Sequence, residues 1–218
     1  MERSVRQINV FTVFWAMVYG FGALGLAWPA TRSFFLFFTP YTLLFGAVHL
    51  LWFEQMRQPK LWWMLLVVWM AGFLVEWAGV ATGLVFGEYA YGEVLGPKLL
   101  GVPLIIGINW TILIYAAAQL ANRIGVSVWL RPLVGATAVT LSDVLIEPVA
   151  VYFEFWNWVQ PPFDALFVAP WQNYLAWWLF SFAVLWGFEA FKVTTNNPML
   201  MRYWLFQLAF FLLLGILI

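Results

Sequence analysis

The sequence predicts an all-α integral membrane protein of about seven transmembrane helices. Hydrophobic residues make up 65% of its 218 residues and charged residues only 9%, whereas soluble domains are about 45–50% apolar and about 25% charged. Apolar stretches of about 20 residues, the length that crosses about 30 Å of hydrocarbon, recur along the whole chain. A chain with so few charged side chains cannot present a water-facing surface, so lipid is its expected solvent.

The seven apolar stretches belong to a single polytopic membrane domain, residues 1–218. We expect helices over 8–27, 33–53, 61–85, 102–121, 129–152, 171–191 and 200–218. Two loops, 86–101 and 153–169, are longer than the rest and rich in aromatic residues, glycine or proline. Loops of about this length are often functional. They are predicted to be lids over a site or, equally, aromatic anchors at the membrane interface.

The basic residues predict the orientation of these spans. The loops on the side of the N-terminus contain Arg3, Arg6, Arg57, Lys60, Arg123, Arg131, Lys192 and Arg202, and the opposite loops contain Arg32 and Lys98. Cytoplasmic loops of membrane proteins carry an excess of Lys and Arg. We therefore expect a cytoplasmic N-terminus, an outer C-terminus and a multi-pass protein of the cell membrane.

An internal repeat relates spans three and four, about 61–122, to spans five and six, about 128–191. A shift of 67 residues places Glu76 on Asp143, Tyr89 on Trp156, Tyr91 on Trp158, Pro103 on Pro170 and Trp110 on Trp177. Each half then contains an acid in a helix, an aromatic pair in an outer loop and a proline that opens the next helix, where its missing N–H costs nothing. Both halves start on the same side, so the repeat is parallel, with its axis along the membrane normal.

Three carboxyl groups are predicted to converge in the outer half of the membrane. Glu76 and Asp143 occupy equivalent places in the repeat, and Glu147 lies four residues after Asp143 on the same helix face. A charge in the bilayer centre costs at least about 2.5–3.5 kcal/mol, so at least one of the three should hold a proton near neutral pH. The alternative is that they only join helices, bonded to Thr140, Ser142, Asn109 or Asn173.

Composition also excludes several classes of function. The chain has no cysteine and one histidine, His49, so disulfides and thiolate or multi-histidine metal sites are not expected. Its formal net charge of zero gives no reason to expect a nucleic-acid partner. Span 200–218 has no lysine for a retinal Schiff base, which disfavours a light-driven pump. We expect neither a metal nor a cofactor.

Buried acids beside many aromatic faces fit the protonation of an alkene and the stabilisation of the resulting carbocation. Aromatic rings attract cations by about 2 kcal/mol or more when desolvated, and a second carboxylate can direct a water to the cation as general base. Glu76 and Asp143 are the predicted acid–base pair, with Glu147 tuning them or orienting water. Composition alone does not separate this chemistry from proton transport.

Two stretches, 76–110 and 143–177, carry ordered motifs. The first reads as a membrane Glu, then T-G-x-x-F-G-x-Y-x-Y, L-G and G-V-P, and the second as Asp143, Pro148, W-x-W, Pro170 and Asn173. They resemble the signatures of the carotenoid biosynthesis family that includes bisanhydrobacterioruberin hydratase and the carotenoid 1′,2′-hydratases. Glu147 stands where that family usually has Asp, and Val168-Ala169-Pro170 replaces a second G-V-P.

The resemblance implies addition of water to the terminal 1′,2′ double bond of an acyclic carotene end group, a hydro-lyase type of reaction. The implied partners are a lipid-soluble carotenoid, the membrane and other enzymes of carotenoid biosynthesis. The residues expected to line the substrate cavity are Tyr89, Tyr91, Trp110, Trp156, Trp158, Asn173 and Trp177.

Three other functional hypotheses are based on the same residues. A lycopene-type cyclase also protonates an end double bond but leaves the mass of the carotene unchanged. A proton-coupled transporter would use the same buried acids for uptake. A structural partner would hold a carotenoid complex without catalysis.

Overall fold

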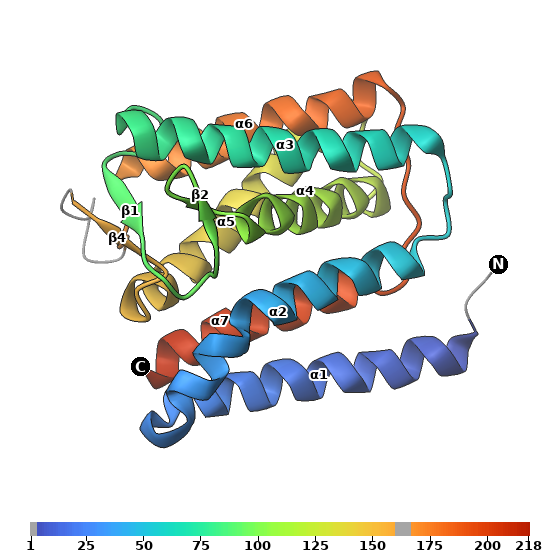
Figure 1. The fold of residues 1–218 in the computed structure, drawn as a ribbon. Coiled ribbons are helices and arrows are strands. Elements are labelled where there is room, and N and C mark those ends of the chain that lie inside the picture. Colours follow the sequence, from blue (N-terminus) through green and yellow to red (C-terminus); the bar gives the residue numbers. More distant parts are fainter. Residues whose placement is uncertain (1–3, 160–166) are drawn as a thin grey trace.

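A computed structural model describes residues 4–159 and 167–218 as a helical bundle capped at one end by short strands (Figure 1). The helices are α1 (Val5–Ala27), α2 (Pro29–Phe53), α3 (Pro59–Thr82), α4 (Ile105–Arg123), α5 (Arg131–Tyr152), α6 (Trp171–Ala190) and α7 (Leu200–Leu217). The strands are β1 (Tyr89–Tyr91), β2 (Lys98–Leu99), β3 (Val102–Pro103) and β4 (Trp156–Trp158). The predicted all-α fold is confirmed, and each of the seven expected spans corresponds to one helix.

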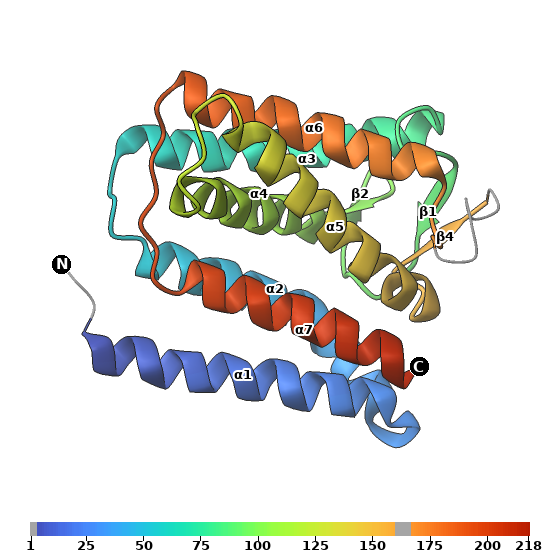
Figure 2. The ribbon, with the colours of Figure 1, turned by 180° about the vertical axis from the view of Figure 1, so that it is seen from behind.

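Six of these helices are long and apolar enough to cross a membrane, which supports a multi-pass membrane protein. The helix outside this set is α6, because Gln172, Asn173 and several tryptophans lower its mean hydropathy. Apolar composition therefore accounts for six spans rather than the seven predicted. Figures 1 and 2 nevertheless place α6 beside α5, within the same bundle.

Two predicted helix boundaries are wrong on either side of the loop 86–101. The third helix ends at Thr82 because Gly83 adopts a left-handed conformation, φ 67°, which glycine enters without a steric penalty. The fourth helix begins at Ile105, since Val102 and Pro103 form β3 and pair with β2. Pro103 therefore does not open a helix as expected, whereas Pro170 caps the start of α6.

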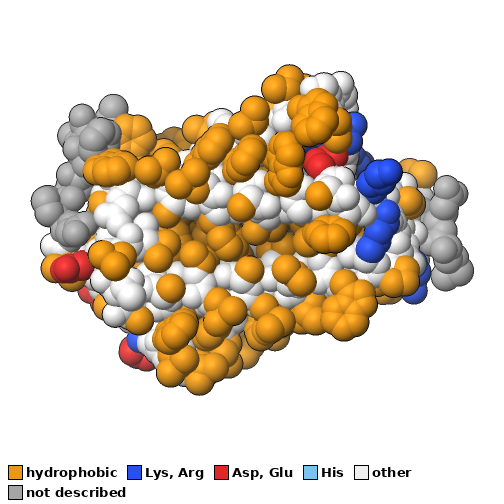
Figure 3. Space-filling model, turned by 90° about the horizontal axis from the view of Figure 1, so that it is seen from above, with side chains coloured by type: hydrophobic (Ala, Val, Ile, Leu, Met, Phe, Trp, Pro, Cys, Tyr) orange, Lys and Arg blue, Asp and Glu red, His pale blue; other side chains and the backbone are white. Residues whose placement is uncertain are grey.

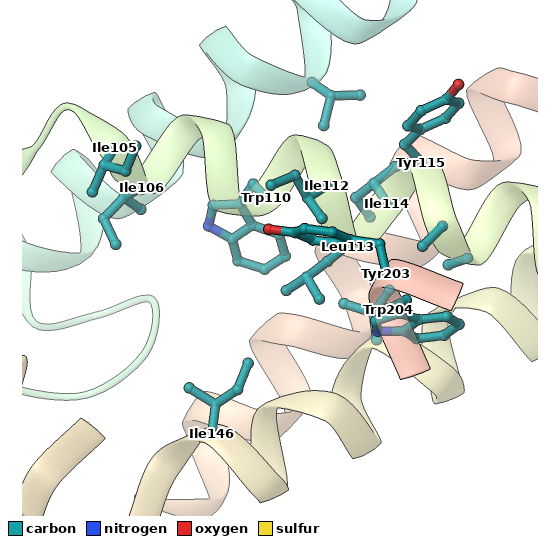
Figure 4. Packing of buried hydrophobic residues seen from close by; sticks show 14 of the residues in the cluster. Ile105, Ile106, Trp110, Ile112, Leu113, Ile114, Tyr115, Ile146, Tyr203 and Trp204 are labelled. Atoms are coloured by element: carbon teal, nitrogen blue, oxygen red, sulfur yellow. The ribbon is translucent and has the colours of Figure 1, made fainter. Parts of the chain in front are cut away.

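Helix α4 lies in the centre of the bundle, with α3 and α6 on one side and α1, α2 and α7 on the other (Figures 1 and 2). Of its 19 residues, 13 are buried. Ile146 of α5 and Tyr203 and Trp204 of α7 lie around it in the close view of Figure 4. Three successive alanines, 116–118, let neighbouring helices approach closely, as small residues do in membrane bundles.

The two termini lie at opposite ends of the bundle (Figure 1). Figure 3 shows hydrophobic side chains over most of the face seen from above, with Lys and Arg gathered towards one end. Side chains such as Phe21, Trp63 and Leu205 are more than half exposed. A band of exposed apolar side chains between polar ends is the surface that a bilayer covers.

The two long loops predicted from the sequence meet as a small antiparallel sheet over the end of the bundle. Strand β1 pairs with β4 in the register Tyr89↔Trp158, Ala90↔Asn157 and Tyr91↔Trp156. Residues 160–166 of the second loop lie outside the described part of the chain. The described part places both aromatic pairs beside the buried acids, where their side chains donate hydrogen bonds to Glu76 and Glu147.

Candidate active site

The three predicted acids are buried together at the strand-capped end of the bundle. Glu76 of α3 is 4% exposed, and Asp143 and Glu147 of α5 are 0% and 1% exposed. Buried carboxyl groups are stable only when donors or a proton satisfy their oxygens. The donors around each acid therefore indicate its charge and its accessibility.

Glu76 accepts three hydrogen bonds. Its Oε2 accepts from the hydroxyls of Tyr89 at 2.5 Å and Tyr91 at 2.7 Å, and its Oε1 accepts from Trp110 Nε1 at 2.9 Å. Gly72, one turn before Glu76, makes room for the indole, because a Cβ there would lie 2.7 Å from Trp110 Cβ. Three donors on one carboxylate stabilise its negative charge.

Glu147 and Asp143 share a second set of donors. Glu147 Oε2 accepts from Trp158 Nε1 at 2.9 Å and Trp156 Nε1 at 3.2 Å. The side-chain amide of Asn173 donates to Asp143 Oδ2 at 2.7 Å and, more weakly, to Glu147 Oε1 at 3.4 Å. Within residues 4–159 and 167–218, no polar group reaches Asp143 Oδ1, which is buried. An oxygen without a donor, next to another acid, favours a neutral carboxylic acid over a second anion.

Aromatic rings hold these donors in place. The ring of Tyr89 lies 5.0 Å from that of Trp158, and the ring of Tyr91 lies 5.9 Å from that of Trp156, as the β1–β4 register requires. The pKa of Tyr89 and that of Tyr91 lie above the ordinary value of 10.0. Burial is the largest cause of the rise in pKa, and the negative charge of Glu76 is the next. Both hydroxyls therefore stay protonated at neutral pH and remain donors to the carboxylate.

A small chamber of about 20 Å³ lies between the two sets of donors. Its lining residues are Glu76, Phe86, Tyr89, Tyr91, Ile106, Asn109, Trp110, Glu147, Trp156, Trp158, Asn173 and Trp177. A cavity needs about 10–15 Å³ to hold a water, together with polar partners. The chamber therefore has room for about one water between two carboxyl groups.

A much larger cavity of about 560 Å³ adjoins this chamber. Ile106, Asn109 and Trp156 line both spaces, so the two spaces are neighbours that share these three residues. The larger cavity is an apolar groove between α1, α2 and α7, and a volume of this size accommodates an extended organic molecule. We call these two spaces the acid chamber and the apolar groove.

The structure brings together all ten residues predicted for the site. Nine of them line the acid chamber, and Trp110 and Trp177 stack there with ring centroids 4.0 Å apart. Asp143 lies behind the chamber wall, joined to it through Asn173, so Glu76 faces Glu147 across the chamber rather than Asp143. Sequence reasoning assigned no role to Phe86 or Ile106, although Phe86 belongs to the first motif.

The fold and the site define a helical membrane protein with a buried, water-sized acid chamber next to an apolar groove. Residues 37–218 match the family described as "Carotenoid biosynthesis protein", and the chain belongs to that family. The resemblance seen in the sequence is therefore confirmed.

One curated relative is the bisanhydrobacterioruberin hydratase of Haloarcula japonica, which is 36% identical to this chain over 115 residues. The match covers 48% of this chain and 36% of that relative, so this chain spans well under half of the relative's length. No solved structure matches the chain.

Proposed function

We propose that this protein is a carotenoid hydratase, which adds water to the terminal 1′,2′ double bond of an acyclic carotene end group. The observation that carries the proposal is the water-sized chamber between Glu76 and Glu147, next to a groove suited to a hydrocarbon chain. The hydratase named among the relatives supports the same reaction class. The finer assignment of the double bond follows from the acyclic end group that the motifs imply.

In this proposal Asp143 and Glu147 share one proton, and Glu147 delivers it to the alkene because it is the member of the pair that lines the acid chamber. The carboxylic acid of Glu147 is backed by Asp143 through the shared amide of Asn173. The electron pair of the double bond takes the proton of Glu147 and forms a new C–H bond, leaving a tertiary carbocation. Aromatic side chains that line the chamber would stabilise this cation, among them Trp156, Trp158 and Trp177.

Glu76 is the complementary base. The water in the acid chamber forms the C–O bond with the cation and gives its proton to the Glu76 carboxylate. Tyr89, Tyr91 and Trp110 hold that carboxylate in one orientation and keep its charge stable before the proton arrives. The next water to enter the chamber returns the proton from Glu76 to Glu147, so the cycle consumes only alkene and water.

The proposal includes the membrane topology. The end of the bundle that contains the starts of α1, α3, α5 and α7 carries most of the described basic residues, which supports a cytoplasmic N-terminus. Helix α6, packed along α5, would be the seventh span, because its polar groups Asn173 and Ser181 are buried inside the bundle. The protein would then be a single polytopic domain of the cell membrane.

The parallel repeat is also part of the proposal. The central pair of the β1–β4 ladder, Ala90 and Asn157, consists of two positions separated by the repeat length of 67, and the flanking pairs exchange equivalent positions. The stacked tryptophans, 110 and 177, are separated by the same length. A two-fold axis that runs between β1 and β4 and between the two indoles accounts for both observations.

The test is expression in a bacterium that accumulates an acyclic carotene, followed by mass measurement of the pigments. Hydration adds the mass of one water per reacted end, and growth in heavy-oxygen water places the label in the product. In heavy water, one deuterium also appears on the carbon next to the new alcohol. An isomer that keeps the mass of the carotene in ordinary water and gains one deuterium in heavy water would identify a cyclase instead. Unchanged pigment together with pH-dependent uptake into proteoliposomes would identify a transporter.

A further inference from the structure

The apolar groove is the largest cavity that we describe, and three helices outside the predicted repeat form most of it. Its walls include Gly22 of α1, Thr42 of α2 and Phe210 of α7. None of these helices contributes an acid to the chamber, so their part in the reaction is not explained by the chemistry of Glu76 and Glu147. The function of the groove therefore has to be explained separately from the acid chemistry.

The deep part of the groove lies next to the acid chamber. Leu26 and Ile146 in its walls are 3% and 4% exposed, and Ile106, Asn109 and Trp156 line both the groove and the chamber. Asn109 is the polar residue at this boundary, and its side chain borders both spaces. A molecule lying in the groove would therefore present one end to the carboxyl groups.

The outer rim of the groove faces the surrounding lipid. Phe21 of α1 and Phe34 of α2 line the groove, yet they are 62% and 61% exposed. Helices α1 and α2 both have the composition of membrane spans, so these exposed rings face acyl chains rather than water. A hydrocarbon dissolved in the bilayer can enter through such a rim without crossing water.

We propose that the apolar groove between α1, α2 and α7 binds the unreacted polyene arm of the substrate and admits it sideways from the bilayer. This inference rests on the proposed function for the identity of the reacting end. The occupant is an extended, unsaturated hydrocarbon chain, because most of the side chains that line the groove are apolar and the groove lies next to the alkene-protonating chamber. Asn109 is the positioning residue that the reacting end passes.

Two glycines of α1 provide a matched test. A Cβ at Gly22 would meet only a side-chain atom of Phe210 at 3.5 Å, which is ordinary contact, so Gly22→Leu fills the groove without straining the helix. A Cβ at Gly20 meets nothing within 4 Å, and Gly20 does not line the groove, so Gly20→Leu is the control. Leucine is a better helix former than glycine at both positions. Thr42→Phe fills the groove from the opposite wall as a second variant.

The experiment measures polyene binding and turnover separately in lipid nanodiscs. Quenching of tryptophan fluorescence by an added acyclic carotene reports binding, and pigment mass reports hydration. We expect Gly22→Leu and Thr42→Phe to raise the dissociation constant and KM by about tenfold or more, a loss of about 1.4 kcal/mol. Gly20→Leu should match the unchanged protein in both measurements.

The outcomes separate this inference from the proposed function. If the unchanged protein hydrates carotene and the two filling variants bind and turn over as Gly20→Leu does, the groove is not the site of the arm. If carotene binds and is expelled by Gly22→Leu but is never hydrated, the groove assignment stands and the hydratase proposal fails. Retention of phospholipid in the groove, with carotene binding unaffected by either filling variant, would also overturn the inference.

Discussion

Replacing Glu76 by glutamine removes one charge and leaves the shape of the acid chamber almost unchanged. The amide can be fully satisfied, since its Oε1 still accepts from Trp110 Nε1 while its Nε2 donates to the two tyrosine hydroxyls. A tyrosine hydroxyl can donate or accept, whereas an indole N–H only donates. The donor set therefore fixes which way the amide points, whereas the hydrogens of the two tyrosine hydroxyls lose the carboxylate oxygen as their acceptor.

The expected change in stability is small. Three hydrogen bonds to a charged group become neutral, a loss of about 1 kcal/mol each from the difference between charged and neutral bonds. Against this, the variant no longer buries a charge that costs at least about 2.5–3.5 kcal/mol in a bilayer. The two terms nearly cancel, so we expect a thermal midpoint close to that of the unchanged protein.

The expected change in activity is large. Loss of a general base costs about 100-fold to 10,000-fold in rate. We would measure hydrated carotene per protein in nanodiscs, and thermal unfolding by tryptophan fluorescence on the same preparation. Glu88→Gln is the matched control, because it makes the same substitution in the loop after α3, one residue before Tyr89, at a side chain that is exposed. If Glu76→Gln hydrates carotene as fast as Glu88→Gln does, the role assigned to Glu76 is refuted. If Glu76→Gln does not fold, the expected balance between the hydrogen-bond and burial energies is refuted.

The other predictions concern the donors and a second buried acid. Tyr89→Phe and Tyr91→Phe should each lower the free energy of unfolding by about 1.5–3 kcal/mol, with a double variant that is not additive; additive losses would contradict a shared carboxylate. Because burial and Glu76 raise the pKa of both tyrosines, their contribution to stability is complete below pH 10.0 and is lost as pH rises above it, which alkaline unfolding curves would show. Asn173→Ala should lower kcat more than it raises KM, because it frees Asp143 and Glu147 from their common donor without altering the groove. Glu54→Ala should lower the thermal midpoint but leave kcat unchanged in the folded fraction, and a lower kcat would show that Glu54 also affects the chemistry.

The sequence was sufficient to find the acids because an ionisable residue within an apolar helix is visible by composition alone. The repeat then indicated Tyr89, Tyr91, Trp156 and Trp158, because the shift of 67 residues places the aromatic pair of one loop on that of the other. It could not reveal that β1 and β4 pair, because strands of three residues carry too little periodicity to be recognised.

The sequence did not predict which acid of α5 faces Glu76 across the acid chamber. The spacing of Asp143 and Glu147 places both on one face of α5, but it does not tell which of them reaches the chamber. That depends on how α5 rotates against α6 and on the position of Asn173, both of which are set by tertiary packing. The groove was invisible for a related reason: α1, α2 and α7 are apolar on all sides, so no face of them is marked as the lining of a cavity.

Glu54 shows why burial alone does not identify a chemical acid. It is 3% exposed, and it accepts bonds from the hydroxyls of Tyr115 and Thr195 and from two backbone amides. These bonds join the α2–α3 connection to the α6–α7 connection, and they occupy both of its oxygens. Glu76 is as well satisfied, but it lines a chamber with room for water, and among the described residues one oxygen of Asp143 has no hydrogen-bond partner. The proposed catalytic acids of this fold, on α3 and α5, would therefore differ from Glu54 in having both a donor set that fixes their charge and a space in which a proton can be exchanged.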